Sequence, residues 1–157
     1  MSDTTITHDS SRLRELVDDI RTVMVTTPEP NGELHGRPMT VQRVDDDGTV
    51  WFLVDASAPW LANPLTTVNV AFADGDTWVS ACGSGTVVKD ANVIDELGDP
   101  VSDAWFDEGS TPAALRVAVG HADYWDAPSR LSQLVKMGKA AVTQEPPDMG
   151  DRGVIEP

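Results

Sequence analysis

Short runs of β-branched and aromatic residues recur along this chain of 157 residues, with glycine, proline and aspartate between them. The clearest strand-like runs are Thr22–Thr27, Gly36–Arg43, Thr49–Val54, Val68–Phe72, Thr77–Cys82 and Ala114–Trp125. Short runs separated by turn residues are typical of hairpins in an antiparallel sheet. Closing such a sheet removes its exposed edges. The sequence therefore predicts a mainly β fold with short helices (α+β), arranged as a small antiparallel β-barrel.

The run Gly36–Arg43 differs from the others because it joins the cation of Arg37 to Pro38 and the thioether of Met39. Proline has no backbone N–H, and it pushes the residue before it toward extended backbone. A strand with a proline lies at a sheet edge or at an irregular point of the sheet. A ligand can lie against such a strand, so we expect this run to be a binding strand.

Segments with helical spacing are fewer and short. The first is expected after a cap at Ser10 or Ser11, and its apolar residues are Leu13, Leu16, Val17 and Ile20. Four more short helices are expected within residues 57–64, 90–97, 101–106 and 130–137. The sequence Gly83-Ser84-Gly85 lies between strand-like runs, so it favours a bulge or bend over a nucleotide-binding loop.

The length of the chain fits one domain. Residues 1–10 are polar, and we expect a mobile N-terminal tail there. Residues 141–157 are rich in proline, glycine and acidic side chains, which predicts a disordered C-terminal tail. The expected domain therefore covers residues 11–140.

The formal net charge of −15 comes from 26 Asp and Glu against 11 Lys and Arg. An acidic surface repels phosphate backbones, so nucleic acid is a poor candidate for a partner. The charge fits a chain kept soluble in high salt, and it also fits an acidic surface in ordinary cytosol. Both explanations stay open.

The sequence contains no apolar run long enough to cross a bilayer and no N-terminal secretory pattern, so we expect no membrane contact and a cytoplasmic protein. A single cysteine, Cys82, and three scattered histidines do not form a metal-ligand pattern. We expect Cys82 to be a small buried side chain and His121 to be a structural residue inside a strand. A hydrolase would need a nucleophile beside a base, and the sequence has no nucleophile elbow.

Several motifs resemble, in the same order, the general-stress branch of the pyridoxamine 5′-phosphate oxidase-like family. The resemblance covers roughly residues 10–140. The motifs are Gly36-Arg37-Pro38-Met39, Val50–Ser57, Asn63-Pro64, Val68–Asp74, Trp78–Gly83 with Asp90, Ala104-Trp105-Phe106 and Ala122–Asp126.

This resemblance implies a split β-barrel and a homodimer that holds FMN at its interface. Carried over by position, it implies that the flavin and its ribityl chain lie along Arg37, Pro38, Met39 and Thr40, with Leu53 and Val54 at the end of the next strand. Such a site needs an apolar slot for the ring and positive charge for the phosphate.

The chain departs from the family around the phosphate, where Val54, Ala58 and Trp60 replace a threonine, a serine and a lysine. Each lost charge-assisted hydrogen bond is worth roughly 1.5–3 kcal/mol, so FMN affinity should fall by two or more orders of magnitude. Ser57, the start of the helix at 57–64, Arg37 and Arg43 could compensate in part.

The aromatic residues leave alternatives open. Trp60 could stack on a ring or pack at the dimer interface. Trp105 and Trp125 could line a ligand cavity, or they could belong to the core or to an interface.

Two functions follow from these residues. The first is an FMN-binding oxidoreductase-like general stress protein. The second is a split-barrel dimer that has lost FMN and binds another ligand or a partner. The sequence names no catalytic residue, and a deazaflavin or haem in place of FMN stays open.

Overall fold

The computed structural model describes residues 5–98, 109–126, 137, 141–142 and 151–157. Its strands are β1 (Thr5–Thr7), β2 (Thr22–Pro28), β3 (Leu34–Val44), β4 (Val50–Asp55), β5 (Val68–Asp74), β6 (Thr77–Val88), β7 (Pro112–Asp126) and β8 (Asp151–Ile155). Its helices are α1 (Ser10–Val17), the 3₁₀ turn η1 (Pro59–Ala62) and α2 (Ala91–Leu97). These bounds confirm most of the elements predicted from the sequence.

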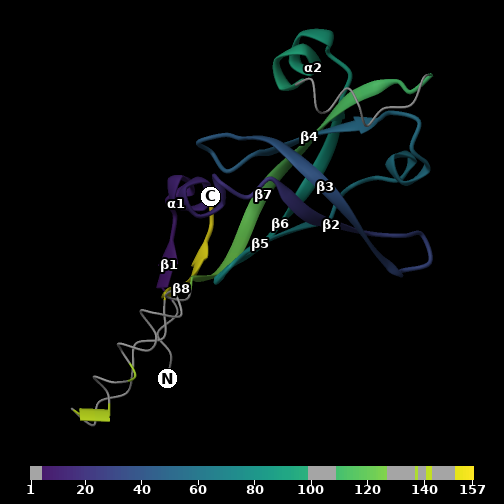
Figure 1. Cartoon of the computed structure of the whole chain (residues 1–157). Helices are drawn as coiled ribbons and strands as arrows, with labels where there is room; N and C mark the ends of the chain where they lie inside the picture. The colour runs from purple at the N-terminus through teal and green to yellow at the C-terminus, as the bar shows by residue number, and fades with distance from the viewer. Residues whose placement is uncertain (1–4, 99–108, 127–136, 138–140, 143–150) are drawn as a thin grey trace.

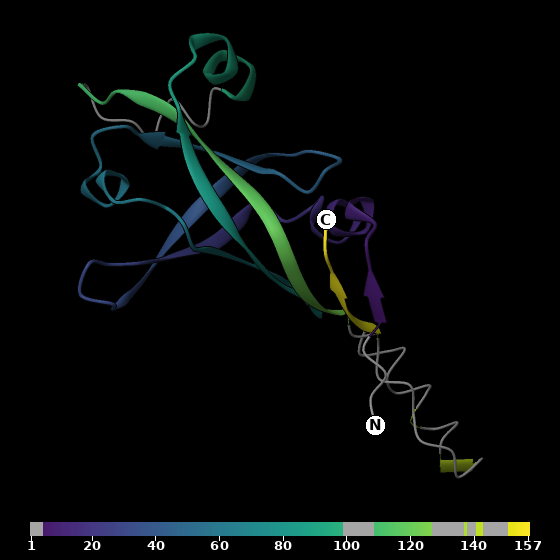
Figure 2. The ribbon, with the colours of Figure 1, turned by 180° about the vertical axis from the view of Figure 1, so that it is seen from behind.

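Six of the strands close into an antiparallel barrel in the order β7-β4-β3-β2-β5-β6, and β6 pairs with β7 to complete it. The first strand-like runs form the hairpins β2–β3 and β3–β4, as expected. Figures 1 and 2 show the long strands β6 and β7 crossing the barrel side by side. The predicted α+β split barrel is therefore confirmed.

The strand that carries Pro38 has a partner on one side only for much of its length. From Leu34 to Thr40, β3 pairs with β2, and its pairing with β4 begins only at Val41. The register between β3 and β4 then shifts between Val41 and Arg43. Proline is tolerated where no second neighbour needs its N–H. The prediction of an edge-like, irregular strand is confirmed.

The glycines between Cys82 and Thr86 mark an irregular point, as predicted. The register of β6 with β7 shifts between Cys82 and Gly83. A Cβ atom on Gly83 would lie 2.0 Å from the carbonyl oxygen of Ala118, a separation that no side chain can adopt. Glycine is therefore required at the point where β6 and β7 close the barrel.

The barrel interior is filled by aliphatic and aromatic side chains from every wall, among them the fully buried Val25, Phe52, Val70, Phe72 and Leu115. Leu13 and Val17 of α1 join this core. A second small cluster lies under α2, where Leu97 packs with Trp51 and Ala114.

The cap of α1 differs from the prediction. The side chain of Asp9 accepts a hydrogen bond from the backbone N–H of Ser11, so Asp9 is the N-cap in place of Ser10 or Ser11. Aspartate satisfies the free N–H groups of a first turn as well as serine does. The 3₁₀ turn η1 has Ala58 at its N-cap without a side-chain hydrogen bond.

Residues 151–155 form a strand, which corrects the prediction of disorder for this part of 141–157. β8 pairs antiparallel with β7 and parallel with β1, and Ile155 is fully buried. Asp151 accepts hydrogen bonds from Arg12 at 3.1 Å and from Tyr124 at 3.3 Å. In Figure 1 the C-terminus lies beside α1 and β1, where β8 joins the sheet. Residues Thr5–Thr7 form β1, so the prediction of a mobile tail over residues 1–10 is wrong for these three residues.

The predicted helix at 101–106, with Trp105, lies outside the described residues, and so do residues 130–136. Among the described residues, no helix is long and apolar enough to cross a membrane. No group of three or more His, Cys, Asp and Glu side chains in that part of the chain could hold a metal ion.

Candidate functional site

One outer face of the barrel carries no charged side chain across four neighbouring strands. Directly paired residues lie on the same face of a sheet, so the register between β3, β2, β5 and β6 defines this surface. We call it the neutral face, and it consists of Thr22, Met24, Thr26, Gly36, Pro38, Thr40, Asn69, Ala71, Ala73, Trp78, Ser80 and Cys82. A continuous uncharged surface is notable on a chain of net charge −15.

A groove of about 450 Å³ opens on this face and is lined mainly by apolar side chains. Met24, Trp78 and Trp125 border it while remaining 44%, 55% and 39% exposed. Pro38 also lines it, opposite Met24 in the β2–β3 register. The guanidinium of Arg152 lies 5.2 Å from the centre of the ring of Trp125, one of the residues that line the groove. The volume is within the range of small-molecule pockets, roughly 300–1,000 Å³.

A second feature lies at the β2–β3 hairpin, where Arg37 makes several contacts. Its Nη2 donates to Glu29 Oε1 at 2.8 Å, and its Nη1 donates to Thr27 Oγ1 at 2.9 Å. Its guanidinium also lies over the ring of Trp60, 4.6 Å from the ring centre. We call Thr27, Glu29, Arg37 and Trp60 the Arg37 corner.

The residues predicted along the flavin divide between two sides of β3. Pro38 and Thr40 belong to the neutral face, whereas Arg37 and Met39 alternate with them and are partly buried. Met39 packs against the main core. Alternation along a strand causes this division, because successive side chains point to opposite faces.

The residues predicted on and after β4 lie in different surroundings. Val54 is buried in the main core, and Leu53 packs against the small cluster under α2. Trp60 is partly buried against the main core. Both the N–H and the hydroxyl of Ser57 donate to Asp55 Oδ1, at 2.9 and 2.7 Å.

These two hydrogen bonds from Ser57, the backbone one first, hold the pKa of the Asp55 carboxyl below its ordinary value. The polar groups of this loop are therefore paired with each other.

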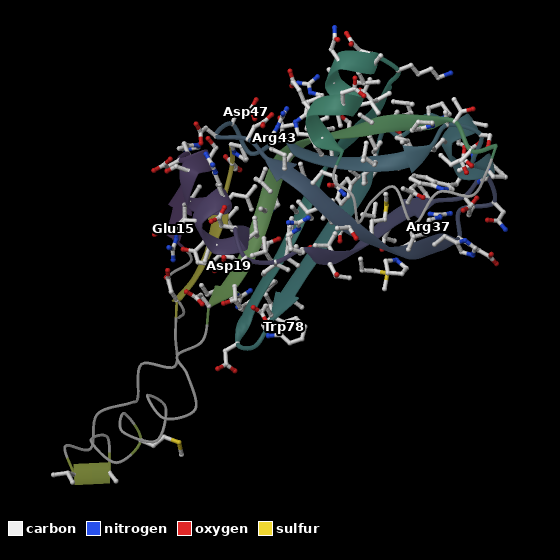
Figure 3. All side chains as sticks on the ribbon, turned by 45° about the horizontal axis from the view of Figure 1, so that its top comes forward. Glu15, Asp19, Arg37, Arg43, Asp47 and Trp78 are labelled. Carbon is white, nitrogen blue, oxygen red and sulfur yellow. The ribbon has the colours of Figure 1, made fainter. Side chains whose placement is uncertain are left out.

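Arg43 does not join the Arg37 corner. Figure 3 shows Arg37 near the β2–β3 hairpin and Arg43 close to Asp47 at the opposite end of β3. There Arg43 donates to Asp45 Oδ1 at 2.7 Å and stacks over Trp51. From the sequence alone, Arg43 could not be excluded as a second positive charge for the phosphate, because only the length of β3 separates it from Arg37.

The structure corrects the prediction for Cys82, which is exposed. Its Sγ accepts a hydrogen bond from Asn69 Nδ2 at 3.3 Å. His121 lies inside β7 as predicted, and its Nε2 is 3.3 Å from Asp123 Oδ2.

Three residues that sequence reasoning did not single out now belong to the candidate site: Glu29, Met24 and Trp78. Only the alternation along β2 and β6 could have indicated Met24 and Trp78.

Residues 8–148 match the family described as "Pyridoxamine 5'-phosphate oxidase like". The chain belongs to this family. The match spans more than half of the chain and includes the β3 strand and the Arg37 corner. The resemblance inferred from the ordered motifs is therefore confirmed. A comparison with curated proteins finds no match.

Several solved structures share this pyridoxamine 5′-phosphate oxidase-like fold. A candidate general stress protein 26 from Jannaschia sp. CCS1 is 22% identical with a TM-score of 0.72, over 90% of this chain and 94% of that one. A general stress FMN/FAD binding protein from Xanthomonas citri is 29% identical with a TM-score of 0.63, over 76% and 90%. A protein related to general stress protein 26, from Clostridium acetobutylicum, is 18% identical with a TM-score of 0.63, over 74% and 87%.

Proposed function

We propose that this chain is a flavin-binding, oxidoreductase-like member of its family that works as a homodimer. The observation that carries the proposal is the apolar groove on the neutral face, bordered by Met24, Trp78 and Trp125. Membership of the family and the similarity to an FMN/FAD binding protein support it.

The groove suits the ring of a flavin better than its phosphate. Planar aromatic ligands gain from apolar walls and from tryptophan side chains that can stack on them. Exposed apolar side chains here would lose water contact when such a ring binds. A bound flavin would supply the electron-transfer chemistry, and the protein would position it and keep water away.

The phosphate of FMN fits this chain less well. Val54, Ala58 and Trp60 offer it no hydroxyl and no ammonium group, and Arg37 already contacts Glu29. Ser57 is paired with Asp55. The residues present therefore fit the ring and do not fit the phosphate, and we derive no reaction step from FMN.

The homodimer is proposed through the neutral face. Two copies of a chain with net charge −15 repel each other over most of their surface, and contact is least costly where charge is absent. Twofold pairing would bring the same apolar patch of each copy together, as symmetric dimers require. The groove would then be enclosed by the partner copy.

The test measures flavin binding and assembly on the purified full chain. Riboflavin and FMN are added separately, excess ligand is removed by gel filtration, and the visible spectrum and mass by light scattering are recorded. A dimer that retains a flavin absorption band supports the proposal. Absence of binding to both flavins at millimolar ligand overturns it.

A second function is favoured by one set of residues. The loss of all three polar positions at Val54, Ala58 and Trp60 is expected of a barrel that has abandoned flavin and binds another ligand or a partner protein. A dimer that binds neither flavin would make this function the leading one. Location in the cytoplasm stays a prediction under both.

A further inference from the structure

A row of paired side chains crosses three strands beside the groove on the neutral face. The register pairs Trp78 of β6 directly with Trp125 of β7, and Trp125 directly with Arg152 of β8. Directly paired residues of an antiparallel sheet point to the same face, with Cβ atoms about 4.5–5.5 Å apart. Among the described residues of β7, only Trp125 lines the groove. Trp125 therefore lies between the groove and the C-terminal strand.

Arg152 contacts the ring of Trp125, and no carboxylate in the described part of the chain pairs with it. Its guanidinium lies 5.2 Å from the ring centre, and the side chain is exposed. The three other described arginines that lie over aromatic rings form ion pairs as well: Arg12 with Asp151, Arg37 with Glu29 and Arg43 with Asp45. The cation–π attraction is therefore the interaction that places Arg152, and it gives the indole a neighbour on one face.

The position of the Trp125 indole matters because the ring is 39% exposed beside a groove of about 450 Å³. An exposed side chain on a strand has more than one rotamer open to it. An indole that turned into the groove would bury apolar surface and fill the space that a ligand needs. Attraction to a cation on β8 favours the opposite placement, in which the indole is a wall of the groove. A wall that is fixed before the ligand arrives loses less conformational entropy on binding.

We propose that Arg152 is a positioning residue of the ligand site, which holds the Trp125 indole as the wall on which the ring of a bound flavin stacks. The proposal rests on the proposed flavin function. It makes the C-terminal strand a part of the site, although no residue of β8 is among those that line the groove. Because the cation acts on the indole, the effect requires no charge on the ligand.

The first experiment measures the dissociation constant of riboflavin, which carries no phosphate, by fluorescence titration of the purified full chain. In Arg152→Gln the constant should rise about two- to fivefold, which corresponds to the loss of a cation–π contact at an exposed site. Arg152→Lys keeps a cation for the ring and should bind riboflavin as the wild-type chain does. An unchanged constant in Arg152→Gln overturns the proposal.

Lys89→Gln is the matched control, because Lys89 is exposed and its removal changes the net charge equally. If both variants weaken binding equally, overall charge explains the effect and the proposal fails. The Trp125→Leu background tests whether Arg152 acts through the ring. There, Arg152→Gln should leave the constant unchanged. The same loss in both backgrounds would mean that Arg152 contacts the ligand itself, and it would overturn the positioning role.

A second measurement needs no ligand, so it separates this proposal from the proposed function. The indole Nε1–H signal of Trp125, assigned by its loss in Trp125→Phe, reports the order of the ring through nitrogen relaxation in NMR. The order should fall in Arg152→Gln and persist in Arg152→Lys and Lys89→Gln. Equal order in Arg152→Gln and the wild-type chain overturns the positioning role even if riboflavin binds. If no flavin binds, the proposed function fails, while a loss of order in Arg152→Gln still supports Arg152 as the residue that holds Trp125.

Discussion

The neutral face and the Arg37 corner both include residues of β3, on opposite sides of that strand, and their side chains differ in how far the protein itself satisfies them. On the neutral face, Trp78 and Met24 remain exposed although they are apolar. At the Arg37 corner, the charged group is partly buried and has protein partners on its edge and on one face. On the neutral face, a ligand or a second copy of the chain would bury apolar surface that is now exposed. At the Arg37 corner, the charged group is already bound by side chains of the same protein.

The difference shows that neighbouring residues of one motif can lie in different surroundings. Arg37 and Pro38 are neighbours in the motif that led to the family, but alternation along β3 sends them to opposite sides. Pro38 contributes to the groove, and Arg37 faces Glu29 and Trp60. From the sequence alone, the motif assigned Arg37 and Pro38 to the same ligand.

The largest expected effect concerns Gly83, at the point where β6 and β7 close the barrel. Gly83→Ala should lower the free energy of unfolding by about 3 kcal/mol or more, because the new Cβ would overlap the carbonyl oxygen of Ala118. Thermal or urea unfolding measures the change. Gly120→Ala is the control, since a Cβ there meets no atom within 4 Å. Equal stability of the two variants would show that the β6–β7 pairing tolerates the extra atom at position 83.

The next effect concerns the neutral face as the proposed dimer interface. Trp78→Glu should weaken a homodimer at least about a hundredfold, because a charge at the centre of an apolar contact loses its water. Sedimentation equilibrium gives the dissociation constant. Ile6→Glu, at another exposed apolar position on β1, should leave it unchanged. An unaltered dimer in Trp78→Glu would move the interface away from the neutral face.

A smaller effect is expected at the Arg37 corner. Arg37→Met should destabilise the chain by about 1 kcal/mol, since Glu29 would keep a partly buried charge without its partner. Arg14→Met removes an ion pair with Asp46 that is far more exposed, and it should change stability by less than about 0.5 kcal/mol. Chemical denaturation compares the variants. Indistinguishable midpoints would show that the corner contributes no more than a surface pair.

The smallest effect is a titration near the corner. The pKa of Asp55 is lowered from 3.8 by hydrogen bonds from Ser57, so its contribution to stability is complete above that ordinary value. It is lost as the pH falls through the lowered folded pKa. Carbon NMR of the carboxyl group should give a midpoint below 3.8 that rises in Ser57→Ala. A midpoint at the ordinary value in the wild-type chain would mean that Ser57 is free to bind a ligand.

The elements of the barrel could be predicted because their signals are local. Runs of β-branched residues with turns between them identified β2 to β7, and the motif order identified the family. The candidate site could be predicted only in part. Pro38 lines the groove, whereas the partner of Arg37 is Glu29, which in the sequence is only one residue of a predicted turn.

The sequence by itself determined the class of fold and the irregular point in the sheet near Gly83, because each depends on residue type and short-range spacing. The tertiary structure alone decided that Asp151–Ile155 is a strand, since five residues become ordered only when β7 and β1 supply hydrogen bonds and a place for Ile155. It also decided that Cys82 is exposed and that Arg37 forms an ion pair with Glu29. Burial and pairing are properties of neighbours brought together from distant parts of the chain, and no local pattern encodes them.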